Sequence, residues 1–285
     1  MPEFFPAGGL WVNVLFFLSG WLSCRLMLPG IVSIIKGAGF LRPNYRGSHI
    51  PAGLGLFLLP SCLMVLVVFF LFMPEYLRAR SAVFMFALSF FTLLGLADDC
   101  WGNKRCRGMA GHLASLFKGN PTTGSIKALG GGAGALFIAM LISRNDVTPL
   151  TIALHALTVA LSVNAVNLFD LRPGRAAKFF LLLAIPMIVI YQNRPETIFA
   201  SLAAGSLLAY LPLDLGGEGM MGDAGSNSLG AVLGITAIML FDNLSLSIFL
   251  FIILALNVLA ERVSFTRVIA SSRILDFIDR LGTKT

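Results

Sequence analysis

Long apolar segments recur along the chain and are separated by short polar stretches. Each has close to the 17–25 residues, roughly, that a helix needs to cross a bilayer. They lie at 10–32, 52–73, 81–97, 126–143, 148–169, 177–193, 196–213, 226–241 and 243–260. Several contain glycine or proline, which membrane helices tolerate. The pattern predicts an all-α polytopic membrane protein with about nine transmembrane helices, or ten if the end of the chain also enters the membrane.

The pattern changes after Glu261. Residues 263–281 mix apolar side chains such as Ile274 and Phe277 with charged ones, which is typical of an amphipathic helix at a membrane surface. We therefore expect a single transmembrane helical domain over residues 1–262, with functional loops at its cytoplasmic face, and a cytoplasmic amphipathic tail over residues 263–285.

Composition and charge agree with a membrane protein and predict its orientation. Of the 285 residues, 57% are hydrophobic and 12% are charged, against about 25% charged in soluble domains. Sixteen lysines and arginines lie in the tail and in the alternate connections on its side, and four lie in the other connections. The positive-inside rule then places the N-terminus outside and the C-terminus in the cytoplasm. The net charge of +7 is explained by topology, so we expect no nucleic-acid partner.

The first candidate site is Gly95–Asp99, at the cytoplasmic end of the third apolar segment. Adjacent carboxylates such as Asp98 and Asp99 are costly there unless a cation neutralises them. Mg²⁺ is usually held by one or two carboxylates together with substrate phosphates. The alternative is a solvated helix end without a ligand.

The second candidate site closes the fifth apolar segment. Asn164, Asn167 and Asp170 share one helix face and are expected to face a cavity or a neighbouring helix. Hydrogen bonding between helices without catalysis is the alternative. Arg172 and Arg175 follow directly, and paired guanidinium groups suit a diphosphate. They could equally serve only to set the orientation of the chain in the membrane.

The third candidate site is Gly222–Gly230. Asp223 precedes small residues, including Gly225 and Ser226, that open a helix, and free backbone N–H groups at such a position favour anions. A carboxylate beside them suits a metal–phosphate arrangement. Lys118 precedes the fourth segment and Lys127 lies at its start. They could contact phosphates, or they could serve only to set the orientation of the chain in the membrane.

The order and the common side of these motifs resemble the polyprenyl-phosphate N-acetylhexosamine-1-phosphate transferase superfamily. That group includes phospho-N-acetylmuramoyl-pentapeptide transferase and the initiating GlcNAc-1-phosphate transferases. The RGSHIPAGLG sequence at Arg46–Gly55 is similar to the family's H-x-x-P-x-x-G-G region. Gly95–Asp99 resembles its aspartate pair, Asn164–Asp170 its N-x-x-N-x-x-D-G helix end, and Gly222–Gly230 its G-D-x-G-S loop.

The resemblance implies transfer of a sugar-1-phosphate from a UDP-sugar to a polyprenyl phosphate, with release of UMP, at the cytoplasmic face of a bacterial plasma membrane. It implies roles in catalysis for Asp98, Asp99 and Asp223. Asp98 or Asp99 would deprotonate or position the lipid phosphate. Asp223, with Asp170 and Asp99, would hold Mg²⁺, with Mn²⁺ as the alternative ion. The expected substrate-binding residues are Asn164, Asn167, Asp170, Arg172, Arg175, Lys118, Lys127, Gly225 and Ser226. A homodimer is compatible with this expectation.

Two departures from the family pattern support an alternative function. After Asp170 the chain reads Leu171-Arg172-Pro173-Gly174-Arg175, without the family's second aspartate, and its last third has no histidine-rich loop. A catalytically altered relative that binds lipid phosphate or regulates envelope assembly therefore stays open. A secondary transporter is suggested by the number of spans alone. Transporters place ionisable residues near the bilayer midplane, whereas here the acids gather at one face.

Overall fold

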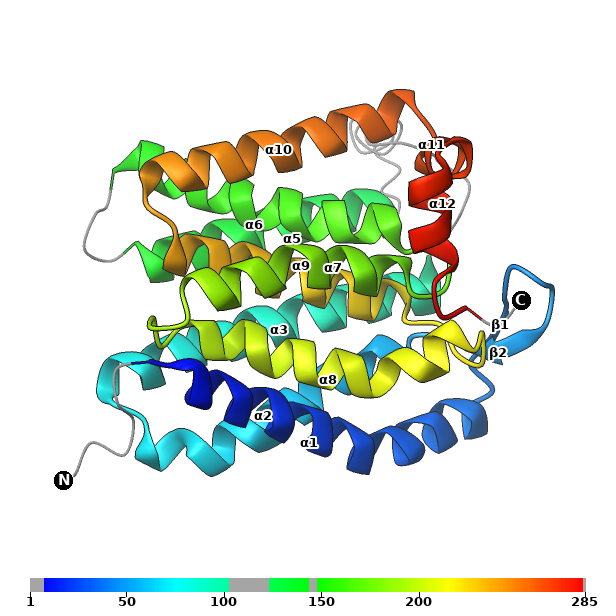
Figure 1. Ribbon diagram of the computed structural model, residues 1–285, viewed down its shortest axis with the longest axis horizontal. Coiled ribbons are helices and arrows are strands. Elements are labelled where there is room, and N and C mark those ends of the chain that lie inside the picture. The colour runs from blue at the N-terminus through cyan, green and yellow to red at the C-terminus, as the bar shows by residue number, and fades with distance from the viewer. Residues whose placement is uncertain (1–7, 103–122, 144–147, 284–285) are drawn as a thin grey trace.

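The computed structural model describes residues 8–102, 123–143 and 148–283 as a bundle of long helices (Figure 1). The helices lie side by side and run lengthwise in alternating directions. The long elements are α1 (Leu10–Gly37), α2 (Leu58–Phe69), α3 (Glu75–Trp101), α5 (Thr123–Ile142), α6 (Pro149–Phe169), α7 (Arg175–Ile190), α8 (Thr197–Leu215), α9 (Gly222–Leu240) and α10 (Asn243–Arg262). Short 3₁₀ turns flank α2 at Leu54–Phe57 and Phe70–Phe72.

All nine predicted apolar segments are helical, which confirms the all-α class. Within the described ranges, seven helices are long and apolar enough to cross a membrane. The two other segments form α7, which has only 16 residues, and α9, which opens with small and polar residues. The chain is thus a polytopic membrane protein, and the count of nine spans stays a prediction.

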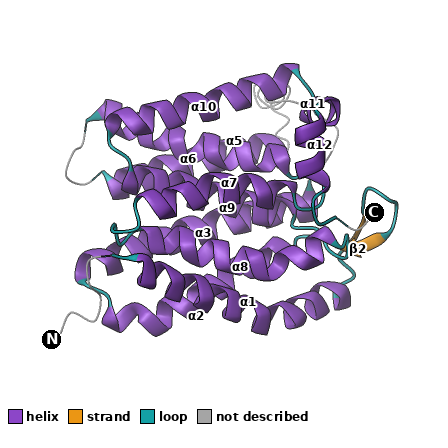
Figure 2. Ribbon diagram, viewed as in Figure 1, coloured by secondary structure: helices purple, strands orange, loops and turns teal. Residues whose placement is uncertain are grey.

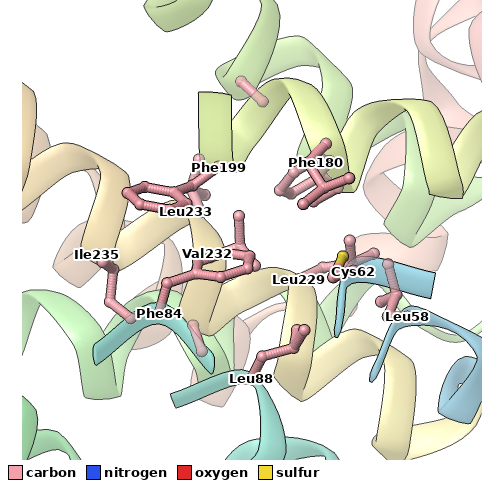
Figure 3. Close-up of a cluster of buried hydrophobic side chains, with 14 of the residues drawn as sticks. Leu58, Cys62, Phe84, Leu88, Phe180, Phe199, Leu229, Val232, Leu233 and Ile235 are labelled. Atoms are coloured by element: carbon pink, nitrogen blue, oxygen red, sulfur yellow. The ribbon is translucent and has the colours of Figure 1, made fainter. Parts of the chain in front are cut away.

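Helix α9 lies at the centre of the bundle. Every residue from Ala224 to Leu240 is buried, and α9 packs closely on α3 and α6. Small residues allow this approach: a Cβ on Gly230 would collide with the backbone of Val163 in α6. Apolar side chains from several helices fill the space around α9 (Figure 3), where Phe84 of α3 and Phe199 of α8 stack with ring centroids 4.8 Å apart.

A small β-hairpin at one end of the bundle is the only sheet within the described residues (Figure 2). Its strands β1 (Leu41–Pro43) and β2 (His49–Pro51) pair antiparallel. The hairpin is fixed to the connection between α8 and α9, because the Met220 N–H donates to the Pro51 carbonyl at 2.8 Å and the Leu54 N–H donates to the Met220 carbonyl at 3.0 Å. The hairpin therefore stands beside the ends of α8 and α9.

The tail forms two short helices at this same end. They are α11 (Phe265–Ser271) and α12 (Arg273–Arg280), and α12 runs across the direction of the long helices (Figure 1). The break falls at Ser272, whose hydroxyl accepts from the Leu275 N–H and so begins α12. The segment predicted as one amphipathic helix therefore consists of two short helices.

Candidate active site

A cavity of about 800 Å³ lies at the hairpin end of the bundle, within the range of small-molecule sites. The hairpin, the C-terminal ends of α3, α6 and α8, and the N-terminal ends of α5 and α9 surround it. Its described charged lining consists of Arg42, Asp98, Asp99, Asp170, Arg172, Asp214 and Asp223. Five acidic side chains against two guanidinium groups make the lining rich in carboxyl oxygens, which are the ligands that hard cations prefer.

Lys127 already brings a cation to two of these carboxylates. Its ammonium group pairs with Asp223 and lies 3.5 Å from Oδ2 of Asp98. These three side chains retain only about a quarter of their exposure. They come from α5, α9 and α3, so the three helix ends are joined by one ionic cluster. The cluster shows that Asp98 and Asp223 together accommodate one positive charge.

Asp99 has a different environment from Asp98, although the two are adjacent in the sequence. Its Oδ1 accepts from the Asp223 N–H at 2.9 Å, and its Oδ2 accepts from the Ala224 N–H at 3.0 Å. These are free N–H groups of the first turn of α9, where a carboxylate is favourable. The position at the start of this helix that favours an anion is therefore occupied by the Asp99 carboxylate.

Two glycines permit this contact between α3 and α9. Gly222 has φ +71°, and a Cβ there would meet the carboxylate of Asp99. A Cβ on Gly95 would collide with the backbone of Asp223. Glycine at both positions lets the acidic end of α3 reach the start of α9.

Asp170 and Asp214 also line the cavity. Burial and the neighbouring carboxylates of Asp214 and Asp223 raise the pKa of Asp170 well above its usual range. Asp214 is 6% exposed, and its Oδ2 accepts from the Gly174 N–H at 2.8 Å. Gly174 has φ +73°. Asp214 thus anchors the turn between α6 and α7, which carries Asp170 into the cavity.

Asp214 is not among the site residues predicted from the sequence. The signal was the same as for Asp98: a carboxylate at the end of an apolar helix. Arg42, Asn44 and Tyr45 of the hairpin also line the cavity and were missed. They precede the motif at 46–55, and their charge and aromatic character were the available signal.

The two asparagines of the second motif make interhelical hydrogen bonds. Asn164 donates to Oδ1 of Asn257 in α10 at 2.5 Å, and Asn167 donates to Oδ1 of Asn227 in α9 at 2.9 Å. Asn167 also lies beside the Asp223 carboxyl group, so it adjoins the acidic cluster. Both asparagines lie outside the described cavity lining.

The paired arginines point to different places. Arg172 is exposed and lines the cavity. Arg175 is 5% exposed and binds Asp279 of α12 with two hydrogen bonds of 2.8 and 2.7 Å. Only Arg172 is therefore available to a ligand in the cavity.

The remaining predicted residues do not contact the cavity within the described part of the chain. Gly225 and Ser226 are buried behind its wall, and the Ser226 hydroxyl donates to the Gly222 carbonyl at 3.2 Å. Lys118 lies outside the described residues. Among the described ones, no three His, Cys, Asp or Glu side chains are arranged to hold a metal ion. Any ion bound by Asp98 and Asp223 therefore needs further ligands from substrate or water.

One comparison with known proteins bears on this geometry. The model of a family described as glycosyl transferase family 4 matches residues 81–241, more than half of the chain. The match runs from α3 to the end of α9 and includes Asp98, Asp99, Asp170, Asp214 and Asp223. No curated protein matches the sequence.

Proposed function

The chain belongs to glycosyl transferase family 4, the polyprenyl-phosphate sugar-1-phosphate transferases, and from this premise we propose its reaction. The cavity binds a UDP-sugar and transfers N-acetylhexosamine-1-phosphate to a polyprenyl phosphate, with release of UMP. The product is a polyprenyl diphosphate sugar for envelope polysaccharide or glycoconjugate synthesis.

The position of the cavity is the observation that carries this proposal. Its charged lining stands at one end of a bundle whose helices are apolar enough to lie in a bilayer. A lipid acceptor stays in the bilayer, while a nucleotide-sugar donor arrives from water. A charged cavity at the boundary between these two phases is where their phosphates can meet.

The reaction requires one bond to form and one to break. An oxygen of the polyprenyl phosphate attacks the β-phosphorus of the UDP-sugar. The bond from that phosphorus to the oxygen bridging to the α-phosphate breaks, and UMP leaves with the bridging oxygen. Positioning and charge stabilisation supply most of the catalysis in phosphoryl transfer.

Basic side chains on two sides of the cavity suit this charge. Arg42 from the hairpin and Arg172 from the turn between α6 and α7 line it and would bind phosphate oxygens as planar donors. The ammonium group of Lys127 in α5 lies beside Asp98 and Asp223. Asp98, whose carboxylate is not occupied by helix N–H groups as that of Asp99 is, would position the lipid phosphate or take its proton.

The donor set fits Mg²⁺, or Mn²⁺ as the alternative ion. Asp98 and Asp223 already share one cation in Lys127, and two carboxylates with substrate phosphates are a common Mg²⁺ environment. Asp223 and Asp98 would hold the ion, and Asp170, which lies near Asp223, would stand beside it. When bound, the metal neutralises negative charge on the transferred phosphate and the leaving group.

We place this cavity at the cytoplasmic face of a bacterial plasma membrane. The basic residues that predict the cytoplasmic side include Lys36, Arg46 and Lys178, which belong to elements at the cavity end. UDP-sugars are water-soluble, so a cytoplasmic opening would give the donor access.

UMP release by purified protein tests the proposal. We expect UMP release that requires both polyprenyl phosphate and a UDP-sugar. EDTA should stop this release, and the Asp223→Asn and Asp98→Asn variants should not show it. Asp242→Asn is the matched control, because Asp242 caps α10 at the far end of the bundle and its loss should leave the rate unchanged. Folded wild-type protein that binds polyprenyl phosphate without releasing UMP would favour the catalytically altered relative instead.

A further inference from the structure

The tail helices contact both sides of the turn that enters the cavity. We define the C-terminal strap as residues 265–280, which comprise α11 and α12. The turn, residues 170–174, joins α6 to α7 and supplies Asp170, Leu171, Arg172 and Pro173 to the cavity lining. The strap meets the chain immediately before this turn and immediately after it.

The contact after the turn is a buried ion pair. Nε and Nη2 of Arg175 donate to the two carboxylate oxygens of Asp279, and Nη1 donates to the Thr266 hydroxyl at 3.1 Å. The side chains of Arg175 and Asp279 are 6% and 12% exposed. A planar, two-bond pair of this kind fixes orientation as well as distance. Arg175 thus joins the first residue of α7 to both strap helices.

Lys178 adds a second contact on the same side. Its ammonium group donates to the carbonyls of Ile278 at 2.9 Å and Asp279 at 2.7 Å. These carbonyls belong to the last turn of α12, where a cation is favourable. The first turn of α7 therefore holds the end of α12 through two cationic side chains.

The contact before the turn is aromatic. Phe265 of the strap stacks on Phe169, the last residue of α6, with ring centroids 5.0 Å apart. Phe169 also stacks on Phe179 of α7 at 4.2 Å. The residue next to Asp170 is consequently held between the strap and α7.

We propose that the C-terminal strap positions the turn 170–174, with Arg175 and Asp279 as positioning residues for the cavity. Arg175 acts through the strap rather than on the substrate. The catalytic consequence of this inference rests on the proposed function, since Asp170 and Arg172 are ascribed substrate or metal contacts there. The clamp itself rests only on the contacts described above.

Asp279→Asn in the full-length protein tests the clamp. The substitution removes the charge and one acceptor oxygen of the pair. We expect backbone hydrogen exchange in residues 170–175 to rise at least several-fold and kcat for UMP release to fall by a similar factor, with less change in KM. The exchange of α9, which the strap does not clamp, should stay unchanged.

A matched control and a rescue sharpen the test. Asp276→Asn removes a carboxylate from the same helix whose partner, Arg280, is 72% exposed in its side chain, so exchange in the turn should match wild type. The exchanged pair Arg175→Asp with Asp279→Arg should recover part of the protection that either single change loses.

The possible outcomes separate the two proposals. Unchanged exchange in the turn of Asp279→Asn would overturn the positioning role, as would an equal rise throughout the protein, which indicates general destabilisation. A rise confined to the turn supports the clamp even if the wild type releases no UMP. In that case the proposed function fails while the clamp stands.

Discussion

Asp98 and Asp99 are adjacent, but each faces a different partner. Asp98 shares Lys127 with Asp223, whereas both oxygens of Asp99 accept from N–H groups of α9. Successive residues on a helix point about 100° apart, which lets one carboxylate face the cation and the other face the helix start. Asp99 therefore has a structural task besides any part in substrate or metal binding.

Asp99→Ala should destabilise the protein more than Asp98→Ala. Removing Asp99 leaves two N–H groups at the start of α9 without an acceptor, which costs about 1–3 kcal/mol for such buried groups. Asp98→Ala removes only the ion pair between Asp98 and Lys127. Thermal unfolding of both variants in the same detergent is the measurement. Equal unfolding midpoints for the two variants would contradict the role of Asp99 as the cap at the start of α9.

The acidic residues could be found from sequence because charge is rare at the ends of apolar helices. That argument identified Asp98 and Asp99 and applied to Asp214 as well, whereas Asp170 was identified from its helix face and Asp223 from the small residues that follow it. It could not show which partner each group has. Arg175 and Asp279 are separated by 104 positions, and no local pattern indicates that the tail returns to α7. The prediction that Arg175 binds substrate followed from its neighbour Arg172, which does line the cavity.

At the scale of elements, the cavity depends on the close contact of α3 with α9. Gly95 lies where the Asp223 backbone passes, so the side chain of Asp223 is placed by helix packing. A larger residue at 95 would push α9 away and move Asp223 relative to Asp98.

Gly95→Ala should therefore lower both stability and UMP release. Overpacking in a close-packed interior costs about 1–3 kcal/mol, and here the obstructing atoms are backbone. Gly132→Ala is the control, because a Cβ at Gly132 meets open space and alanine raises helix propensity. If the Gly95 variant unfolds at the same temperature as the Gly132 variant, the contact is looser than described.

The strap should stay docked across the neutral range. Hydrogen bonding and the charge of Arg175 hold the pKa of Asp279 below its usual range, and the charges of Lys178 and Arg172 lower it further. A carboxyl group with a lowered pKa in the folded state stabilises that state above its ordinary pKa of about 4 and loses this effect as the pH falls through the folded value.

We expect constant protection of the α12 amides between about pH 5 and pH 8, with loss only below about pH 4; the turn itself is a poorer readout of this pair, because it carries Asp170 with its raised pKa. Hydrogen exchange, corrected for the intrinsic effect of pH, measures this. Undocking between pH 5 and pH 7 would show that Arg175 and Asp279 do not dominate the contact.

The helices could be predicted well because each apolar segment is long enough to form one. Their ends were harder. The sequence indicated α3 over 81–97, whereas the helix runs from Glu75 to Trp101, since charged residues at a membrane boundary can continue a helix. The tail was expected as an amphipathic segment, and its break at Ser272 depends on a cap that the apolar pattern does not reveal.

At the scale of the whole molecule, the described part of the chain gathers its acidic cavity, hairpin and strap at one end of an apolar bundle. α1 begins at the opposite end. This polarity agrees with the distribution of lysine and arginine, from which the cytoplasmic side was predicted.

A reporter fused after the last residue should therefore lie in the cytoplasm. We expect a C-terminal fluorescent protein to mature and a C-terminal alkaline phosphatase, which requires an oxidising compartment, to be inactive. The same phosphatase placed in the turn between α9 and α10, at the far end, should be active. The reverse pattern would place the cavity outside and remove its access to UDP-sugars.

In the proposed reaction the sugar moves together with its phosphate. Two samples of UDP-N-acetylglucosamine, one carrying radioactive phosphorus at the β position and one at the α position, would be incubated with purified protein, Mg²⁺ and polyprenyl phosphate. We expect the β label to enter the lipid fraction and the α label to be released as UMP, and we expect neither with Asp223→Asn. If the β label stays in water as UDP while the sugar reaches the lipid, the protein transfers sugar alone and is not a sugar-1-phosphate transferase.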